Sequence, residues 1–137
     1  MVIKPDVGIT FPWRLELGDD VWLGEGSRIH NLVRVRIGSS VCISQRAYLC
    51  TGSHDYGSRH FDLIVKPIVI EDGAWIAAGA WVGPGVRVGP HAVLLAMSVA
   101  SADLDEDGIY RGNPAAFVRK RVLSARVAVD PSKSASE

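Results

Sequence analysis

Aliphatic side chains recur at every sixth position over most of the chain, each followed closely by glycine or another small residue. The clearest run begins at Ile70 and continues through Ile76, Val82, Val88 and Leu94. In each of these blocks the residue four places after the aliphatic one is small or β-branched. The same frame describes much of residues 17–48, and Ile3 and Ile9 extend it toward the N-terminus.

A period of six fits neither an α-helix nor a strand with one buried face. The 14 glycines and 7 prolines are spread along the chain and would break a helix repeatedly, and such a strand alternates with period two. Three short strands joined by tight turns do fit, with the aliphatic residue facing the axis. The sequence predicts an all-β prism about 25 Å tall, at ~4.8 Å per coil. The alternative is a β-sandwich, whose strands would not keep one phase from Ile70 to Ser98.

Interruptions of the frame indicate where function lies. The steps from Ile9 to Leu17 and from Ile29 to Ile37 are eight residues, which predicts two-residue bulges at corners. A longer insertion at about 50–69 carries two of the four histidines. Loops that leave a regular solenoid commonly carry function.

These interruptions also set the expected domain organisation. The β-helix spans 3–99, a connector and C-terminal cap span 100–123, and a disordered tail covers 124–137. We expect Phe117 and Val118 of the cap to cover the open end of the prism.

Composition and charge exclude several function classes. The chain has 137 residues, enough for one domain with a real core, and 15 basic residues balance 15 acidic ones. Zero net charge argues against general binding to nucleic acid or anionic membranes. No apolar run approaches the ~20 residues that span a bilayer, and the first residues do not form a secretory signal. Only two cysteines occur, which fits a cytoplasmic protein without a disulfide scaffold.

Four motifs together resemble the left-handed β-helix acyltransferases. They are the hexapeptides, the loop Cys50–Tyr56, the string Pro67–Ala78 and the ending Gly112–Ala115. Over about residues 3–121 the chain is most similar to colanic acid biosynthesis acetyltransferases and to the related galactoside, maltose and nodulation-factor acetyltransferases. The resemblance implies a left-handed parallel β-helix with a short cap. It also implies a homotrimer with shared active sites, acetyl-CoA as donor, a saccharide hydroxyl as acceptor, and no metal.

The resemblance places the catalytic histidine on His54. A neutral imidazole can take the proton of a weakly nucleophilic hydroxyl, and holding both substrates together removes the need for a covalent intermediate. We expect the acceptor to contact Asn31, Asp55, Tyr56 and His60. The plainer alternatives are a turn residue for Asn31 and exposed loop residues for the histidines.

The resemblance also predicts the donor site. Expected CoA contacts are Trp75, the backbone N–H of Ala78, Ala96, Ser101 and Arg119. The chain departs from the family at Ser101–Asp103, where many relatives have Thr-Lys-Asp, and at Ala116, where they have a basic residue. Phosphate binding is therefore expected to depend more on Arg119 and its basic neighbours.

Two other functions remain open on the sequence alone. The first is a metalloenzyme like the γ-type carbonic anhydrases, which needs three histidines converging on zinc; His54 and His60 have one residue too many between them. The second is a non-catalytic scaffold, suggested by the altered CoA-facing positions. The sequence names neither the acceptor sugar nor the hydroxyl that is modified.

Overall fold

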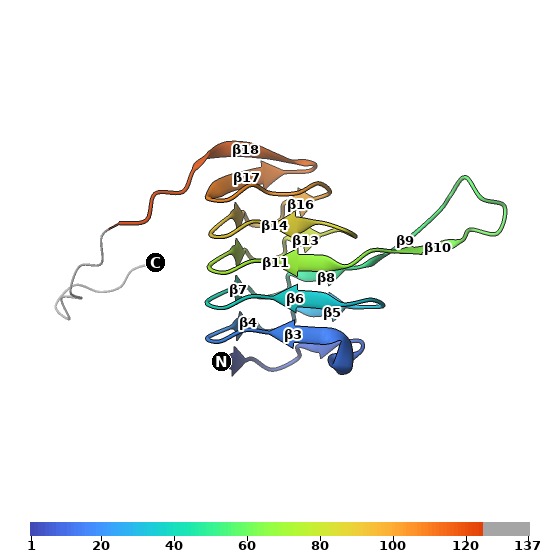
Figure 1. Cartoon of the computed structure of the whole chain (residues 1–137), viewed down its shortest axis with the longest axis horizontal. Helices are drawn as coiled ribbons and strands as arrows, with labels where there is room; N and C mark the ends of the chain where they lie inside the picture. Colours follow the sequence, from blue (N-terminus) through green and yellow to red (C-terminus); the bar gives the residue numbers. More distant parts are fainter. Residues whose placement is uncertain (125–137) are drawn as a thin grey trace.

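The structure, a computed structural model, describes residues 1–124 and is a parallel β-helix of about five turns (Figure 1). The all-β, left-handed β-helix class predicted from the sequence is confirmed. The predicted tail at 124–137 lies outside the described residues except for Ser124.

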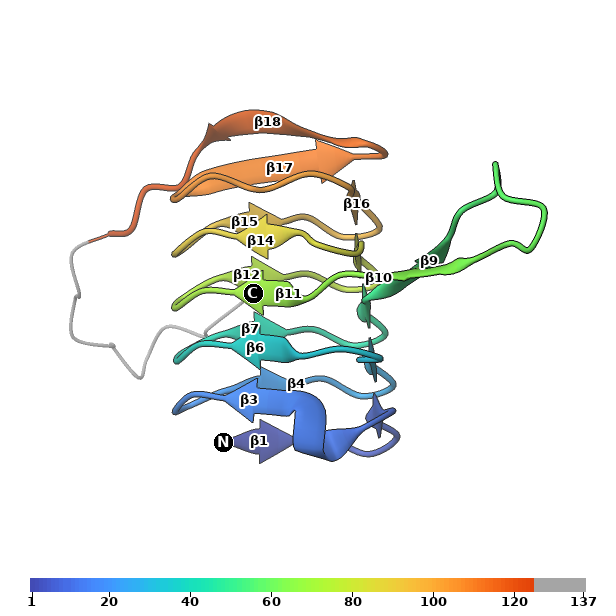
Figure 2. The ribbon, with the colours of Figure 1, turned by 45° about the vertical axis from the view of Figure 1, so that its right-hand side comes forward.

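Three parallel sheets form the three faces of the prism (Figure 2). The first face consists of β1 (Val2–Ile3), β4 (Trp22–Leu23), β7 (Cys42–Ile43), β12 (Trp75–Ile76), β15 (Val93–Leu94) and β17 (Gly108–Gly112). The second face consists of β2 (Gly8–Ile9), β5 (Arg28–His30), β8 (Tyr48–Cys50), β13 (Trp81–Val82) and β16 (Val99–Ala100). The third face consists of β3 (Leu15–Leu17), β6 (Val35–Ile37), β11 (Ile68–Ile70) and β14 (Arg87–Val88).

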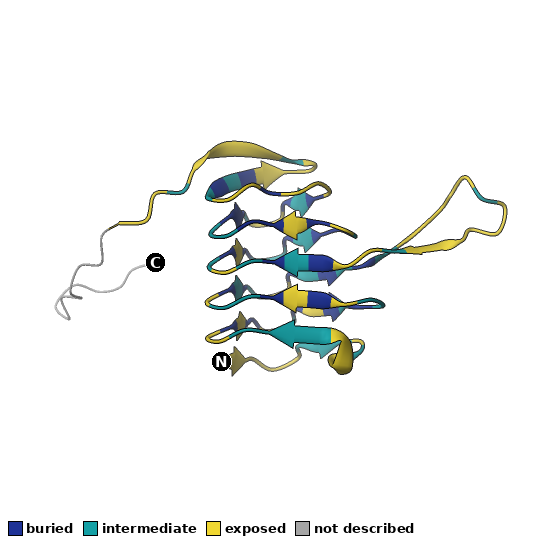
Figure 3. Cartoon of the chain, viewed as in Figure 1, coloured by how far each residue is buried: buried dark blue, intermediate teal, exposed yellow. Residues whose placement is uncertain are grey.

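The aliphatic residue of each hexapeptide points to the axis. Leu23 pairs in register with Ile43, and Ile43 with Ile76, so like residues stack along the first face. All three are fully buried, and the dark-blue positions in Figure 3 mark this core. At roughly 25 cal/mol per Å² of buried apolar surface, this column and the equivalent columns of the other two faces stabilise the fold.

Tight turns with a left-handed residue join the faces in every coil at two of the corners, and Gly85 (φ +77°) forms one such turn at the remaining corner. At the first corner, between the first and second faces, these residues are Asp6, Gly26, Arg46, Gly79 and Met97. At the third corner, between the third and first faces, they are Asp20, Ser40, Gly73, His91 and Asp107. Glycine is required where coils touch: a Cβ on Gly24 would lie 2.4 Å from the backbone nitrogen of Gln45.

The second corner, between the second and third faces, accepts the inserted residues. The first bulge holds the 3₁₀ helix η1 (Pro12–Arg14), the second holds residues 31–34, and the long insertion leaves one coil higher. That insertion forms an antiparallel hairpin of β9 (Gly52–His54) and β10 (Leu63–Val65). Figures 1 and 2 show the hairpin projecting away from the prism.

A hairpin covers the C-terminal end of the helix. β17 adds a parallel strand to the first face, and β18 (Ala115–Lys120) returns antiparallel beside it. The residues that cover the core differ from those expected. Phe117 and Val118 are 55% and 37% exposed, whereas Leu104 and Tyr110 are buried. Tyr110 contacts Phe117 edge-on at 5.7 Å, because β18 lies beyond β17 and not across the end of the prism.

Two serines in one column of the first corner predict opposite effects on stability. Ser27 is fully buried and its hydroxyl has no partner among the described residues, while Ala47 and Ala80 occupy the same position in other coils. Ser27→Ala should stabilise the protein by about 1 kcal/mol, because the unpaired hydroxyl is removed. Ser98→Ala should cost about 1 kcal/mol, because the Ser98 hydroxyl accepts a hydrogen bond from the Gly112 N–H at 2.9 Å. Urea unfolding measures both, and equal effects would contradict the assignment.

Candidate functional site

The long hairpin is anchored to the second corner by Thr51. This residue is fully buried; its hydroxyl donates to the His30 carbonyl at 2.7 Å and accepts from the Leu32 N–H at 3.0 Å. Its own carbonyl accepts from the Lys66 N–H at 3.0 Å, across the base of the hairpin. The hairpin therefore leaves the prism in a defined direction.

His54 is the last residue of β9 and is exposed. Its Nδ1 lies 3.1 Å from the carbonyl oxygen of Phe61, and its ring stacks on the Phe61 ring at 4.2 Å between centroids and 14° between planes. A carbonyl can only accept, so Nδ1 is the donor in this bond. In the neutral ring Nε2 then carries the free lone pair and can accept a proton.

The tip of the hairpin satisfies its own polar groups. Asp55 accepts from the Gly57 N–H at 3.0 Å, so this carboxylate does not orient the imidazole. The Ser58 hydroxyl donates to Asp62 at 2.9 Å and accepts from the His60 N–H at 3.2 Å. Tyr56 is 93% exposed. The structure thus gathers His54, Asp55, Tyr56 and His60 on one hairpin, and their contact with an acceptor remains a prediction.

Asn31 belongs to the scaffold of the second corner. It is fully buried, its Oδ1 accepts from the Phe11 N–H at 2.9 Å, and its Nδ2 donates to the Phe11 carbonyl at 2.8 Å. The side chain that was expected to contact the acceptor is therefore occupied by Phe11.

A cavity of about 320 Å³ lies on the first face, beneath β18. Its apolar lining comes from Trp75, Val93, Leu95, Ile109 and Val118, and its cationic lining from Arg111, Arg119 and Arg121. Two of the predicted CoA contacts, Trp75 and Arg119, therefore share one cavity. The Trp75 indole donates to the Ser44 hydroxyl at 2.8 Å, which fixes its ring.

Arg121 differs from its two cationic neighbours in this cavity. Its guanidinium donates to the carbonyls of Gly73 and His91 at 2.9 and 3.1 Å and so holds the cap to the third corner. Arg111 and Arg119 make no ion pair within residues 1–124. They are the cationic groups of this cavity that a ligand could use.

Ala78 and Ala96 occupy equivalent places in neighbouring turns of the first corner. The Met97 N–H donates to the Ala78 carbonyl at 2.9 Å, which stacks the two turns. In the part of the chain that the structure describes, the N–H groups of Ala78 and Ala96 have no hydrogen-bond partner. Ala96 follows Leu95, which lines the cationic cavity, and both N–H groups could donate to a ligand lying along the prism.

The donor and acceptor residues do not converge within one chain. Trp75, Ala78, Ala96 and Arg119 lie on the first face and the first corner, whereas the His54 hairpin leaves from the second corner. The second face separates the two groups. Ser101 follows β16 and lies at the second corner, apart from the other predicted CoA contacts. A complete site of the predicted composition requires residues from two chains.

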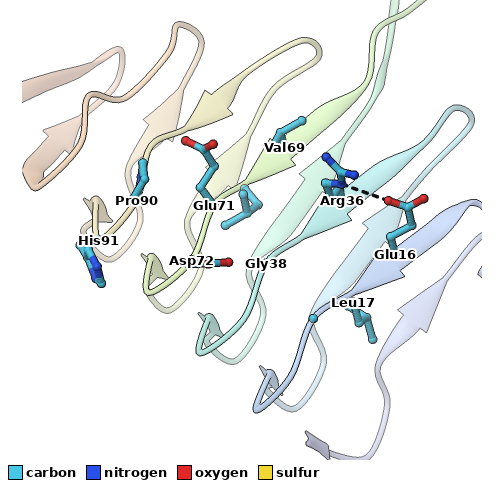
Figure 4. A pocket seen from close by; sticks show the side chains of 11 residues that line it. Glu16, Leu17, Arg36, Gly38, Val69, Glu71, Asp72, Pro90 and His91 are labelled. Atoms are coloured by element: carbon cyan, nitrogen blue, oxygen red, sulfur yellow. Dashed lines mark hydrogen bonds and ion pairs between the residues drawn. The ribbon is translucent and has the colours of Figure 1, made fainter.

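A second cavity, of about 560 Å³, lies elsewhere, on the third face and the third corner (Figure 4). The acidic side chains that line this cavity already have hydrogen-bond or ion-pair partners. Glu16 bonds Arg36 at 3.1 Å, and the Asp72 carboxylate accepts from the Ser39 N–H at 2.8 Å. Glu71 bonds Arg87 at 2.6 Å, and this bond raises the pKa of the Arg87 guanidinium. Size alone does not make this hollow a site.

Two further observations concern the pKa of a tyrosine and the possibility of metal binding. Burial raises the pKa of Tyr48 on the second face, and nearby Cys50 adds to the effect. Within residues 1–124 no group of three or more His, Cys, Asp and Glu side chains is arranged to hold a metal ion.

Comparisons with known proteins place the chain in a family. It is 44% identical over 122 residues to an Escherichia coli (strain K12) protein named "Putative colanic acid biosynthesis acetyltransferase WcaF", covering 89% of this chain and 67% of that one. The chain belongs to the hexapeptide-repeat acetyltransferases. This confirms the resemblance seen in the sequence and shows that the protein is an acetyltransferase. No family model matches the chain.

Solved structures of this family agree with the fold. The hexapeptide-repeat acetyltransferase VCA0836 of Vibrio cholerae O1 biovar eltor, complexed with acetyl-coenzyme A, has a TM-score of 0.82 at 26% identity, over 88% of this chain and 68% of that one. A galactoside acetyltransferase in complex with coenzyme A has a TM-score of 0.78 at 21% identity, over 86% of this chain and 60% of that one. At 21% identity, the similarity to the galactoside acetyltransferase concerns the fold alone. No helix of the described residues is long and apolar enough to cross a membrane.

Sequence reasoning missed two features of the site. Phe61 supports His54 in two ways. Its carbonyl oxygen accepts a hydrogen bond from the imidazole, and its ring stacks on the imidazole ring. The only signal was an aromatic residue beside a histidine in the insertion. Arg111 faces the cationic cavity from β17. Side chains alternate between the two faces of a strand. In a strand that buries Tyr110, the next residue, Arg111, therefore points outward.

The contact between Phe61 and His54 predicts a single imidazole tautomer. In ¹⁵N NMR spectra of the neutral side chain, Nδ1 of His54 should be protonated and Nε2 unprotonated. Phe61→Leu should remove the upfield ring-current shift of the His54 ring protons and keep the tautomer, because the carbonyl remains. A mixture of tautomers in the unaltered protein would contradict the geometry.

Proposed function

We propose that this acetyltransferase moves the acetyl group of acetyl-CoA to a hydroxyl of a saccharide, with His54 as the general base in a ternary complex. The observation that carries the proposal is the exposed His54 ring, whose Nδ1 faces the Phe61 carbonyl and whose Nε2 is free. An acetyl-CoA complex of a relative at 26% identity supports acetyl-CoA as the donor. The name of the 44% identical relative supports a polysaccharide precursor as acceptor.

The chemistry requires one base and a well-placed thioester. As the saccharide oxygen attacks the thioester carbonyl, its proton passes to Nε2 of His54. The tetrahedral intermediate collapses, the carbon–sulfur bond breaks, and the same proton passes from His54 to the departing CoA sulfur. The products are the O-acetyl saccharide and CoA, and His54 returns to its starting state.

The first face carries the groups that we expect to bind the donor. CoA is polyanionic, and the cavity beside Trp75 carries the free guanidinium groups of Arg111 and Arg119 over an apolar floor. Arginine is well suited to phosphate recognition. The unpaired N–H groups of Ala78 and Ala96 can donate to the pantetheine carbonyls. Ser101 lies at another corner and would reach CoA only from a neighbouring subunit.

We further propose that the protein acts as a homotrimer. The hairpin extends from the body of the prism and leaves large apolar surfaces uncovered, with Phe61 54% and Leu63 57% exposed. Exposed apolar surface of this kind marks an interface. A neighbouring chain that covers the hairpin would bring its first corner and cationic cavity toward His54. Closed rotational symmetry then repeats the site in each cleft.

A cytoplasmic location fits this activity. Both cysteines are free thiols, as is usual in a reducing compartment. The same argument supports an acceptor that is modified before export.

His54→Ala should lower kcat for acetyl transfer by about 10²- to 10⁴-fold, the usual contribution of a general base. CoA release in the presence of a sugar panel measures this, and light scattering checks that the trimer remains. His91→Asn is the matched control: this histidine lies at the third corner in a left-handed conformation that asparagine tolerates. A His54→Ala protein that keeps its oligomeric state and its rate would disprove the proposed role.

Arg119→Ala should raise the KM for acetyl-CoA about tenfold, because a charge-assisted hydrogen bond to the 3′-phosphate is lost. The same variant should leave the KM for 3′-dephospho-acetyl-CoA unchanged. If the two donors respond equally, Arg119 does not bind that phosphate. Arg121→Ala is unsuitable as a control, since Arg121 holds the cap in place.

A further inference from the structure

The first bulge of the second corner carries an exposed aromatic cluster that no step of the acetyl transfer uses. Trp13 is 74% exposed, and its ring lies 5.2 Å from that of Phe11, at 48°. The guanidinium of Arg14 lies over the Phe11 ring, 4.8 Å from its centroid. No residue of η1 is buried, so the segment adds nothing to the core.

The cluster is held rigidly although it faces solvent. The buried side chain of Asn31 engages both the N–H and the carbonyl of Phe11, and the Arg14 N–H donates to the same carbonyl at 2.9 Å. Arg14 also donates to the Leu32 carbonyl in the next coil. A bulge that served only to close the corner would not need an exposed tryptophan two residues after a backbone group that a buried asparagine holds.

The position of the cluster links it to the His54 hairpin. Leu32, which receives the bond from Arg14, donates its own N–H to Thr51 at the root of the hairpin. The cluster and the hairpin root thus occupy the same corner two coils apart, about 10 Å at ~4.8 Å per coil. The cationic cavity lies toward the opposite, C-terminal end of the prism, beneath β18.

We propose that Phe11 and Trp13 form a binding platform for a saccharide unit next to the one that receives the acetyl group. This inference rests on the proposed function of the His54 site. The donor's phosphates are drawn to the C-terminal end, so the acceptor approaches His54 from the N-terminal side, where the platform lies. The C–H face of a pyranose ring packs on an indole, and the indole N–H can donate to a sugar hydroxyl. Because the cluster lies about 10 Å from the root of the hairpin that carries His54, at ~4.8 Å per coil, we expect an acceptor of at least two linked sugars rather than a monosaccharide.

The test compares matched acceptors of different length. Methyl glucoside and maltotriose, and methyl galactoside and galactotriose, serve as probes with acetyl-CoA, and CoA release is followed. For pairs that are acetylated, the trisaccharide should have the lower KM. Trp13→Ala should raise the trisaccharide KM about tenfold, a typical effect of losing one aromatic contact. It should leave kcat, the KM for acetyl-CoA and the KM for the methyl glycoside unchanged, and Trp13→Phe should restore most of the affinity.

Trp22→Ala is the matched control, because this tryptophan lies on the first face and is also half-exposed, at 43%. It should leave the trisaccharide KM unchanged. A direct readout is the Trp13 indole N–H signal, assigned by its loss in Trp13→Ala, which should shift when maltotriose or galactotriose is added.

Three results would overturn the platform. The first is an unchanged trisaccharide KM in Trp13→Ala while His54→Ala is inactive, which leaves the proposed function intact. The second is loss of the oligomer in Trp13→Ala, which assigns the cluster to an interface between chains. The third is the absence of acetyl transfer to any saccharide probe by the unaltered enzyme, which removes the proposed acceptor class together with the platform.

Discussion

In-register stacking of one coil on the next is the constraint on which the rest of the molecule depends. Each turn of backbone donates its hydrogen bonds to the coil beside it, so the inward side chains of a face stack as a column of similar residues. Such a column tolerates neither a shift in register nor a bulky residue at the buried small positions beside each corner, such as Ala47 and Ala80. Variation is confined to the outward positions and to the one corner where extra residues leave without disturbing the stack.

The second corner collects all the residues that depart from the frame. Asn31 and Thr51 are buried there and connect consecutive coils through their side chains, in place of the backbone bonds that a regular turn supplies. The same two side chains hold the backbone of the segments that project from this corner. Stability and function therefore share these residues: the polar groups that close the corner also aim the His54 hairpin and the Phe11–Trp13 cluster.

The hexapeptide period predicted a prism of stacked three-strand coils, because burial and turn geometry act on every repeat alike, whereas the left-handed sense came from the family resemblance. It also located the bulges and the insertion, since each is a failure of the period. It could not predict how residues inside the insertion meet. Asp55 follows His54 in sequence, yet the Phe61 carbonyl binds the imidazole, because a hairpin pairs residues across its tip. The cap was misjudged for a related reason: Phe117 is apolar, but its strand lies outside β17 and the core is covered by Tyr110.

The antiparallel return of β18 has a consequence for how the protein behaves at high concentration. A parallel solenoid ends in an unpaired strand, and a second molecule could continue the stack there and start a fibre. β18 runs in the reverse direction, so its free edge does not match the parallel register of an incoming coil. It also carries Arg119 and Lys120, whose like charges disfavour edge-to-edge association of two such ends. β18, which contributes Val118 and Arg119 to the cationic cavity, thus also disfavours polymerisation at this end of the prism.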